Sequence, residues 1–179
     1  MKRFFALLLC LIMAFALVAC DDKDKDGNKN DDDGDSGAKA PQSNVSYYVE
    51  YKSVKIELGA DASALIKSLG TPTSESSAGN CGGLGTLTKY EYGNDLTIYI
   101  LTSGSKQTVD SITLKSDTVL TAKGVGIGSS RAEVLEAHGK NPTSNTDSLI
   151  TYVSGAKTLA FSMRDDTVTK VEYRISNEG

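Results

Sequence analysis

Apolar and polar side chains alternate along several short segments of residues 45–176. In segment 96–101, for example, Leu96, Ile98 and Ile100 fall on one side, and Thr97 and Tyr99 fall on the other. Successive side chains of a β-strand point to opposite faces of a sheet, so this period of two predicts a strand with one buried face. The same pattern predicts further strands at 46–52, 54–58, 87–92 and 109–114.

Two short helices are predicted between these strands. The first covers 62–69, where Asp61 is placed to cap its start and Gly70 to end it. The second begins after Ser130, because Ser130 and Glu133 have the spacing of a capping box. Each helix is too short to be stable alone, so both are expected to pack on the sheet.

The second half of the domain resembles the first. Val125–Gly128 aligns with Ile56–Gly59, and in both halves a helix cap, a helix and a glycine follow. We therefore predict an α+β domain built from two tandem helix-plus-three-strand repeats, at about 54–115 and 123–176. The repeats are expected to form one antiparallel sheet with two short helices on one face.

The polar side of the strands is the predicted binding surface. We take Thr97, Tyr99, Glu172 and Arg174 as its candidate residues and add Cys81 from the Ser- and Gly-rich segment 74–85, which reads as a loop. A sheet face that only meets water has a similar composition, so this alternative stays open. The full set of predicted outward positions is Lys89, Glu91, Thr97, Tyr99, Thr113, Thr158, Ser162, Lys170, Glu172 and Arg174.

The N-terminal segment has the pattern of a secretory signal. Lys2 and Arg3 precede an apolar run at 4–19, which is shorter than the ~20 residues that an α-helix needs to cross a bilayer. A basic start, a short apolar run and small residues before a boundary are typical of a signal that is removed. We therefore expect residues 1–19 to be absent from the mature protein.

The residues at this boundary, Leu17-Val18-Ala19-Cys20, resemble the lipobox of bacterial lipoproteins. The resemblance implies that the Cys20 thiol is diacylglycerylated and that Cys20 becomes the first residue of the mature chain. It also implies a protein anchored to the cell membrane by lipid, on the extracytoplasmic face. The alternative is an ordinary cleaved signal with a cysteine at this position by coincidence.

Residues 20–44 are expected to form a disordered linker before a single domain at 45–179. Positions 21–40 contain eight Asp and four Lys and almost no apolar side chain, so they cannot bury enough surface to fold. Asp22 to Gly27 has the Asp-x-Asp-x-Asp-Gly spacing of a calcium loop, and calcium binding at 22–33 stays an alternative. This segment has no predicted flanking helices and no Glu at the last loop position, so we predict no metal site. We also predict no cofactor.

Charge and cysteine usage narrow the function classes further. The chain has a formal net charge of −4, and the linker carries the acidic excess. The domain is therefore close to neutral and lacks the basic surface of a nucleic-acid-binding protein.

Cys10 belongs to the signal and Cys20 to the anchor, so Cys81 is expected to be a free thiol without a disulfide. His138, the single histidine, is expected half-buried at a helix end, where the helix dipole favours its protonated form. A Cys81–His138 nucleophile pair remains a second hypothesis.

The repeated unit, apolar-x-apolar-Gly followed by a short helix, Gly-x-Pro-Thr and strands, resembles a known group of proteins. These are the tandem-repeat proteins around the β-lactamase-inhibitor protein and the SmpA/OmlA-type envelope lipoproteins, which have one such unit. The layout over about 46–176 is also similar to uncharacterised lipoproteins of Gram-positive anaerobes. The resemblance implies a fold more than an activity. We therefore expect a non-enzymatic module that binds an envelope protein or a wall component. The alternatives are a thiol-dependent enzyme or redox protein using Cys81, or a passive surface lipoprotein.

Overall fold

The computed structural model of the protein describes residues 45–79, 83 and 85–176. The predicted signal, the lipid site Cys20, the linker and its Asp-rich stretch lie outside the described residues, as does Cys81. No helix in the described part of the chain is long and apolar enough to cross a membrane.

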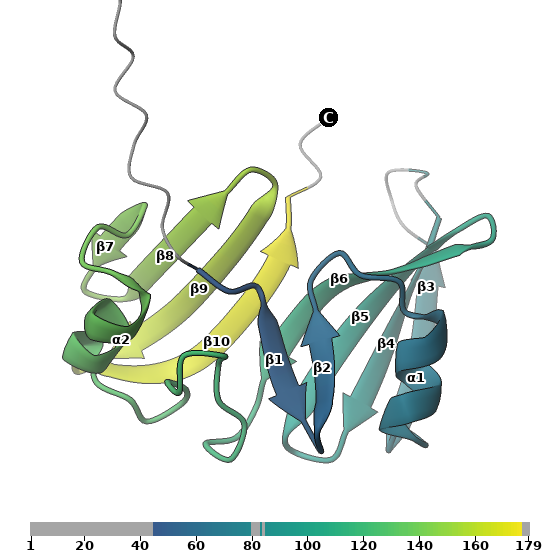
Figure 1. Ribbon diagram of the computed structural model, residues 1–179, viewed down its shortest axis with the longest axis horizontal. Helices are drawn as coiled ribbons and strands as arrows, with labels where there is room; N and C mark the ends of the chain where they lie inside the picture. The colour runs from purple at the N-terminus through teal and green to yellow at the C-terminus, as the bar shows by residue number, and fades with distance from the viewer. Residues whose placement is uncertain (1–44, 80–82, 84, 177–179) are drawn as a thin grey trace, which may run out of the picture. The chain divides into compact units, whose positions relative to one another are not determined.

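The described residues form one sheet of eight antiparallel strands in the order β3-β4-β5-β6-β10-β9-β8-β7, and a separate sheet of two strands (Figure 1). At the centre of the large sheet, β6 pairs with β10 through Ile112 and Tyr173. The elements are β1 (Tyr48–Tyr51), β2 (Val54–Glu57), α1 (Ser63–Leu69), β3 (Ser74–Gly79), β4 (Thr86–Tyr92), β5 (Leu96–Ser103), β6 (Lys106–Leu114), α2 (Arg131–His138), β7 (Ser144–Thr146), β8 (Leu149–Ser154), β9 (Lys157–Arg164) and β10 (Thr167–Ile175).

The two helices and the β1–β2 hairpin lie on one face of the large sheet (Figure 1). Backbone hydrogen bonds fix the start of α1 to a strand of the sheet and the start of α2 to the turn between β9 and β10. The N–H of Ala62, just before α1, donates to the carbonyl oxygen of Gln107 in β6 at 3.0 Å, and the N–H of Arg131 donates to that of Asp166 at 2.9 Å. We call the face under these elements the covered face and the opposite one the open face.

The predicted α+β class with two tandem helix-plus-three-strand repeats is wrong. The described chain is mainly β, with only two short helices, and residues 48–57 form a sheet of their own. Segment 74–79, predicted as a loop, is strand β3, and 144–146 is strand β7, so four strands follow each helix. Both lie at the edges of the sheet, where pairing of backbone N–H and C=O groups with one neighbour forms a strand without an apolar side-chain pattern.

The hydrophobic core lies between the covered face and the elements above it. Its largest fully buried side chains are Tyr152, Tyr173 and Phe161. Most side chains that the alternation assigned inward are buried, whereas Tyr90 is only partly buried at the side of the core. The buried members of that set are Tyr92, Leu96, Ile98, Ile100, Ile112, Leu159, Phe161, Val171 and Tyr173.

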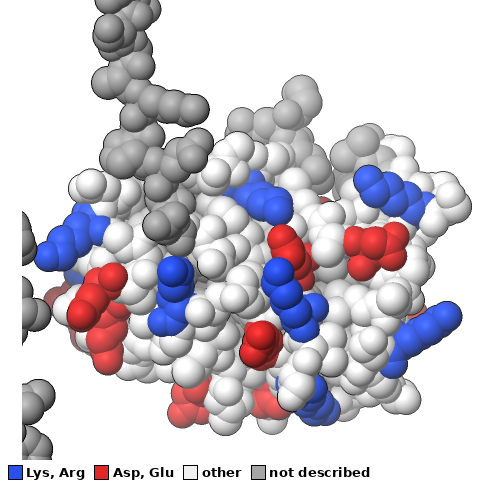
Figure 2. All heavy atoms as spheres, viewed as in Figure 1, with Lys and Arg blue, Asp and Glu red and all other residues white. Residues whose placement is uncertain are grey.

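Charged side chains are scattered over the covered side. Figure 2 shows acidic and basic groups intermingled there, without a broad area of one sign. One of them, Arg131 at the start of α2, binds two hairpin turns at once. Its Nε donates to the Asp166 carboxylate at 2.7 Å, its Nη2 to the Asp147 carbonyl oxygen at 2.9 Å, and its Nη1 to Asn145 Oδ1.

We expect Arg131→Lys to lower the free energy of unfolding by about 1–2 kcal/mol, because an ammonium group cannot span three acceptors that a planar guanidinium reaches together. Urea unfolding at neutral pH measures this loss. The matched control is Arg164→Lys at the exposed end of β9, which should change stability by less than about 0.5 kcal/mol. Equal effects of the two substitutions would contradict a specific role for the Arg131 hydrogen bonds.

Candidate functional site

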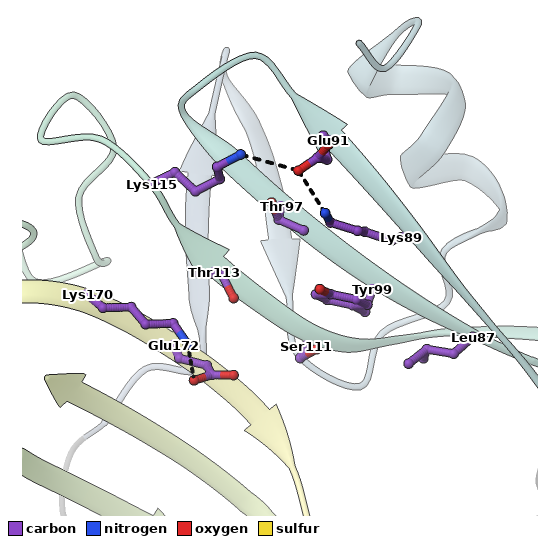
Figure 3. Close-up of a pocket in the computed structure, with 10 residues that line it drawn as sticks. All are labelled: Leu87, Lys89, Glu91, Thr97, Tyr99, Ser111, Thr113, Lys115, Lys170 and Glu172. Atoms are coloured by element: carbon purple, nitrogen blue, oxygen red, sulfur yellow. Dashed lines mark hydrogen bonds and ion pairs between the residues drawn. The ribbon is translucent and has the colours of Figure 1, made fainter. Parts of the chain in front are cut away.

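The open face of the sheet carries the candidate site. Both described helices and the β1–β2 hairpin lie on the other face (Figure 1), and a shallow hollow of about 550 Å³ lies on this face over β4, β5, β6 and β10 (Figure 3). Its uncharged lining residues are Leu87, Thr97, Tyr99, Ser111 and Thr113, and its charged ones are Lys89, Glu91, Lys115, Lys170 and Glu172.

The strand register arranges the open face in rows that cross the sheet. Neighbouring strands lie ~4.8 Å apart, so side chains opposite each other on adjacent strands are within mutual reach. Two rows cross the hollow, one mainly of carboxylates and hydroxyls and the other with a cation at each end. The first consists of Glu91, Thr97, Thr113 and Glu172, and the second of Lys89, Tyr99, Ser111 and Arg174.

Small side chains form the floor of the hollow, and long ones surround them. Thr97 is only 4% exposed, although it lies on the open face, and Thr113 and Ser111 are half-buried. Threonine and serine hydroxyls both donate and accept hydrogen bonds, so the floor presents both kinds of group. Tyr99 adds a half-buried aromatic ring and a phenolic hydroxyl.

Glu91 lies between two lysines at one side of the hollow (Figure 3). Its Oε1 is 2.9 Å from the Nζ of Lys89 and 3.3 Å from the Nζ of Lys115. Hydrogen bonds from these two ammonium groups hold the pKa of Glu91 below its ordinary value. The hydrogen bond to Glu91 likewise raises the pKa of Lys89. Glu91 and Lys89 are therefore charged at neutral pH.

The position of Lys115 depends on the adjoining turn. Lys115 follows the last residue of β6, and its N–H donates to the carbonyl oxygen of Asp95 at 2.8 Å. The Asp95 carboxylate accepts hydrogen bonds from Ser116 at 3.1 Å and from Tyr51 of β1 at 3.1 Å. The hydrogen bonds of Lys115 and Ser116 to Asp95 thus fix the backbone at a place from which the Lys115 ammonium group reaches Glu91.

A second ion pair lies at the other side of the hollow. Lys170 Nζ is 2.8 Å from the Glu172 carboxylate, and both residues are on β10 (Figure 3). The lining therefore contains three lysines and two glutamates, a surplus of one positive charge in a chain whose net charge is −4. Exposed pairs such as these contribute little to stability, so their ammonium groups can change partners at small cost.

The structure brings together three of the five residues proposed from the sequence. Thr97, Tyr99 and Glu172 line the hollow. Arg174 is exposed and shares a row with Tyr99, but it does not line the hollow, and Cys81 lies outside the described residues. Lys89, Glu91, Thr113 and Lys170 also line it but were predicted only as outward positions, and Leu87, Ser111 and Lys115 were not predicted at all. Continuing the alternation of β6 by one residue past Leu114 would have found Lys115.

The expectation of a half-buried, protonated His138 is wrong. The side chain is 3% exposed and belongs to the core on the covered face, where its ring centroid lies 5.6 Å from that of Tyr152 and 5.3 Å from that of Phe161. Its Nε2 is 3.3 Å from the Thr121 hydroxyl, and its Nδ1 has no hydrogen-bond partner among the described atoms. Burial, and secondarily the charge of Lys123, lower its pKa to about 4. His138 is therefore neutral at pH 7.

Within the described residues, no group of three or more His, Cys, Asp or Glu side chains is arranged to hold a metal ion. The residues around the hollow instead supply ammonium groups, carboxylates and hydroxyls, which are hydrogen-bonding groups suited to holding a polar ligand. We therefore treat the hollow as a candidate binding site.

Comparison with known proteins assigns the chain to no family. No family model and no curated protein matches the chain. An extracellular protein with an SCP domain from Bacillus anthracis is 16% identical with a TM-score of 0.40, over 68% of this chain and 44% of that one. A cysteine-rich secretory protein from Staphylococcus aureus is 13% identical with a TM-score of 0.34, over 68% and 45%. The chain thus spans less than half the length of either structure, and likenesses at TM-scores below 0.5 assign it no function.

Proposed function

We propose that this protein is a lipid-anchored envelope protein that binds another envelope component on the open face of its sheet and catalyses no reaction. The observation that carries the proposal is the polar hollow on the sheet face opposite the two helices and the β1–β2 hairpin. Its ammonium groups and hydroxyls are charged or polar groups directed away from the core. Such groups can bind a polar partner through hydrogen bonds and ion pairs, and this binding needs neither a nucleophile nor a metal ion.

The extracytoplasmic address is part of the proposal and rests on the sequence. The basic start, the short apolar run and Leu17-Val18-Ala19-Cys20 support export followed by acylation of Cys20. Stable anchoring takes more than one acyl chain, because each buried CH₂ group contributes ~0.8 kcal/mol and a single chain binds reversibly. Residues 20–44 then connect the anchor to the folded domain.

Cys20→Ala tests the anchor. In cells labelled with palmitate, we expect the wild-type chain in the membrane fraction with label on it, and the variant in the soluble fraction or the medium without label. Cys10→Ala is the matched control, because it changes a cysteine inside the signal and leaves Cys20 in place. Palmitate label that remained on the Cys20→Ala chain would refute lipid anchoring at this residue.

Binding to the envelope tests the site. The full chain, solubilised in detergent, is sedimented with washed envelope fragments of the cells that produce it. We expect Tyr99→Ala combined with Arg174→Ala to weaken co-sedimentation by about tenfold or more, since a half-buried aromatic contact and a charge are removed from one row. Lys67→Ala on α1, on the covered side, is the control. Unchanged binding of a correctly folded double variant, checked by circular dichroism, would show that the open face is not the site.

A further inference from the structure

The ion pair of Glu91 with two lysines has the form of an occupied anion site. One carboxylate oxygen accepts from both Lys89 and Lys115, while each ammonium group has three donors. The lysine side chains are 36% and 35% exposed, so a second carboxylate arriving from solution can reach both. Both lysines line the hollow on the side of Glu91, next to the floor residue Thr97 (Figure 3).

The floor beside these lysines suits the hydroxyl groups of a sugar. Thr97, Thr113 and Ser111 present hydroxyls that donate and accept, and sugar hydroxyls do the same. The Tyr99 ring adds a flat apolar surface of the kind that the C–H face of a pyranose can contact. A bare anion such as phosphate would use the lysines and leave this floor without a role.

The lining of the hollow fits a protein partner less well than it fits a sugar. The energy of protein interfaces is concentrated in a few buried aromatic or apolar anchors and arginines. The hollow has one tyrosine and one aliphatic side chain, Leu87, and the rest of its lining is polar or charged. Its volume of about 550 Å³ falls in the ~300–1,000 Å³ range of small-ligand sites and exceeds the needs of a single ion.

We infer that the hollow binds a saccharide that bears a carboxylate, with Lys89 and Lys115 on the carboxylate and Thr97, Thr113 and Tyr99 on the neighbouring sugar ring. This inference rests on the proposed function and specifies its ligand class. Glu91 then competes with the ligand for the two lysines. The surplus positive charge of the lining favours the anionic ligand further.

Calorimetry with the full chain in detergent tests this inference. The probes are a galacturonic acid tetramer, the same tetramer with its carboxylates methyl-esterified, and a glutamate pentapeptide. We expect the acidic tetramer to bind at least about tenfold more tightly than its ester, because the ester cannot accept charge-assisted hydrogen bonds. We expect it to bind more tightly than the peptide, which has the charges but no ring or hydroxyls.

Variants of the ion pair should change affinity in opposite directions. Lys115→Ala should weaken binding of the acidic tetramer about five- to tenfold, because it removes a charged donor. Glu91→Gln should strengthen it, because it releases both lysines. If the Glu91–Lys115 pair served only to hold the site together, both substitutions would weaken binding. Lys67→Ala should have no effect.

Several results would overturn the inference. These are no heat of binding from the tetramer at millimolar concentration, equal affinity for the ester, tighter binding of the glutamate pentapeptide, or a loss of affinity in Glu91→Gln. Any of them leaves the proposed function standing if the Tyr99 and Arg174 double variant still loses envelope binding. If the double variant still co-sedimented fully with the envelope while the wild type bound the tetramer, the envelope partner would bind elsewhere and the ligand class of the hollow would stand.

Discussion

Replacing His138 with Leu should reduce by about 2–3 kcal/mol the free energy of unfolding that the protein loses between pH 7 and pH 4.5. Burial lowers the pKa of His138 from 6.5 to about 4, and each unit of pKa difference between the folded and unfolded states corresponds to ~1.4 kcal/mol. Between these two values the unfolded chain binds the extra proton and the folded chain does not. The contribution of neutral His138 is therefore complete above pH 6.5 and is lost as the pH falls towards 4.

The measurement is urea unfolding of the wild type and His138→Leu at pH 7 and pH 4.5. Carboxylates titrate in both proteins, so the difference between the two pH dependences isolates the histidine. Leucine is a reasonable replacement because the ring contacts Tyr152 and Phe161, while its Nδ1 has no described partner. Thr121 keeps the hydrogen bond that its hydroxyl oxygen accepts from the N–H of Val125.

His138 also allows a direct test, because it is the only histidine in the chain. Its imidazole protons give a single set of NMR signals, and their titration should show a midpoint near pH 4 in the folded state. A midpoint near 6.5, or equal pH dependences of the two proteins in urea, would contradict the buried neutral histidine.

Alternation identified the strands whose two faces differ in polarity. Predicted segments 96–101 and 109–114 lie within β5 and β6, because Ile98 and Ile112 face the core while Thr97 faces the opposite side. The predicted first helix also agrees with α1 to one residue. Its cap differs in detail, since Ala62 is the capping position and the Asp61 carboxylate accepts from the N–H of Ser63 at 2.9 Å.

The elements that sequence reasoning missed lack a side-chain signal. All of β3 is exposed, and its Ser, Ala and Gly residues are held by the backbone of β4. Short polar β7 pairs only with β8 in the same way. The helix dipole argument failed for His138 because it treated α2 alone. Packing of α2 on Tyr152 and Phe161 buries the ring, and desolvation then outweighs the dipole.

The sequence predicted which face of the sheet carries the site, but not where on that face the site lies. Period two places Thr97 and Tyr99 on the open face from the sequence alone. Only the pairing of β6 with β10, which are distant in sequence, puts Glu172 beside Thr113. Sequence alternation also cannot show that Lys89 and Lys115 share Glu91, because the contact depends on the turn that holds Lys115.

Gly85→Ala should lower the free energy of unfolding by about 2–4 kcal/mol, a loss typical of severe backbone conflicts. Gly85 has φ +138°, a conformation that side chains disfavour, and an added Cβ would lie 2.0 Å from the carbonyl oxygen of Thr102. That oxygen belongs to the backbone of β5, so it cannot rotate away as a side chain would. The start of β4 would have to move off β5, although Thr86 pairs there with Thr102.

Gly79→Ala is the matched control, because Gly79 ends β3 with an ordinary φ and no atom lies within 4 Å of an added Cβ. It should be neutral or should stabilise by up to about 1 kcal/mol, since alanine restricts the unfolded chain. Urea unfolding of both variants measures the contrast, and equal stabilities would contradict the close approach of β4 and β5. Because β4 also carries Lys89 and Glu91, its pairing with β5 holds this side of the hollow in place. Gly85→Ala should therefore weaken binding on the open face even under conditions in which the protein remains folded.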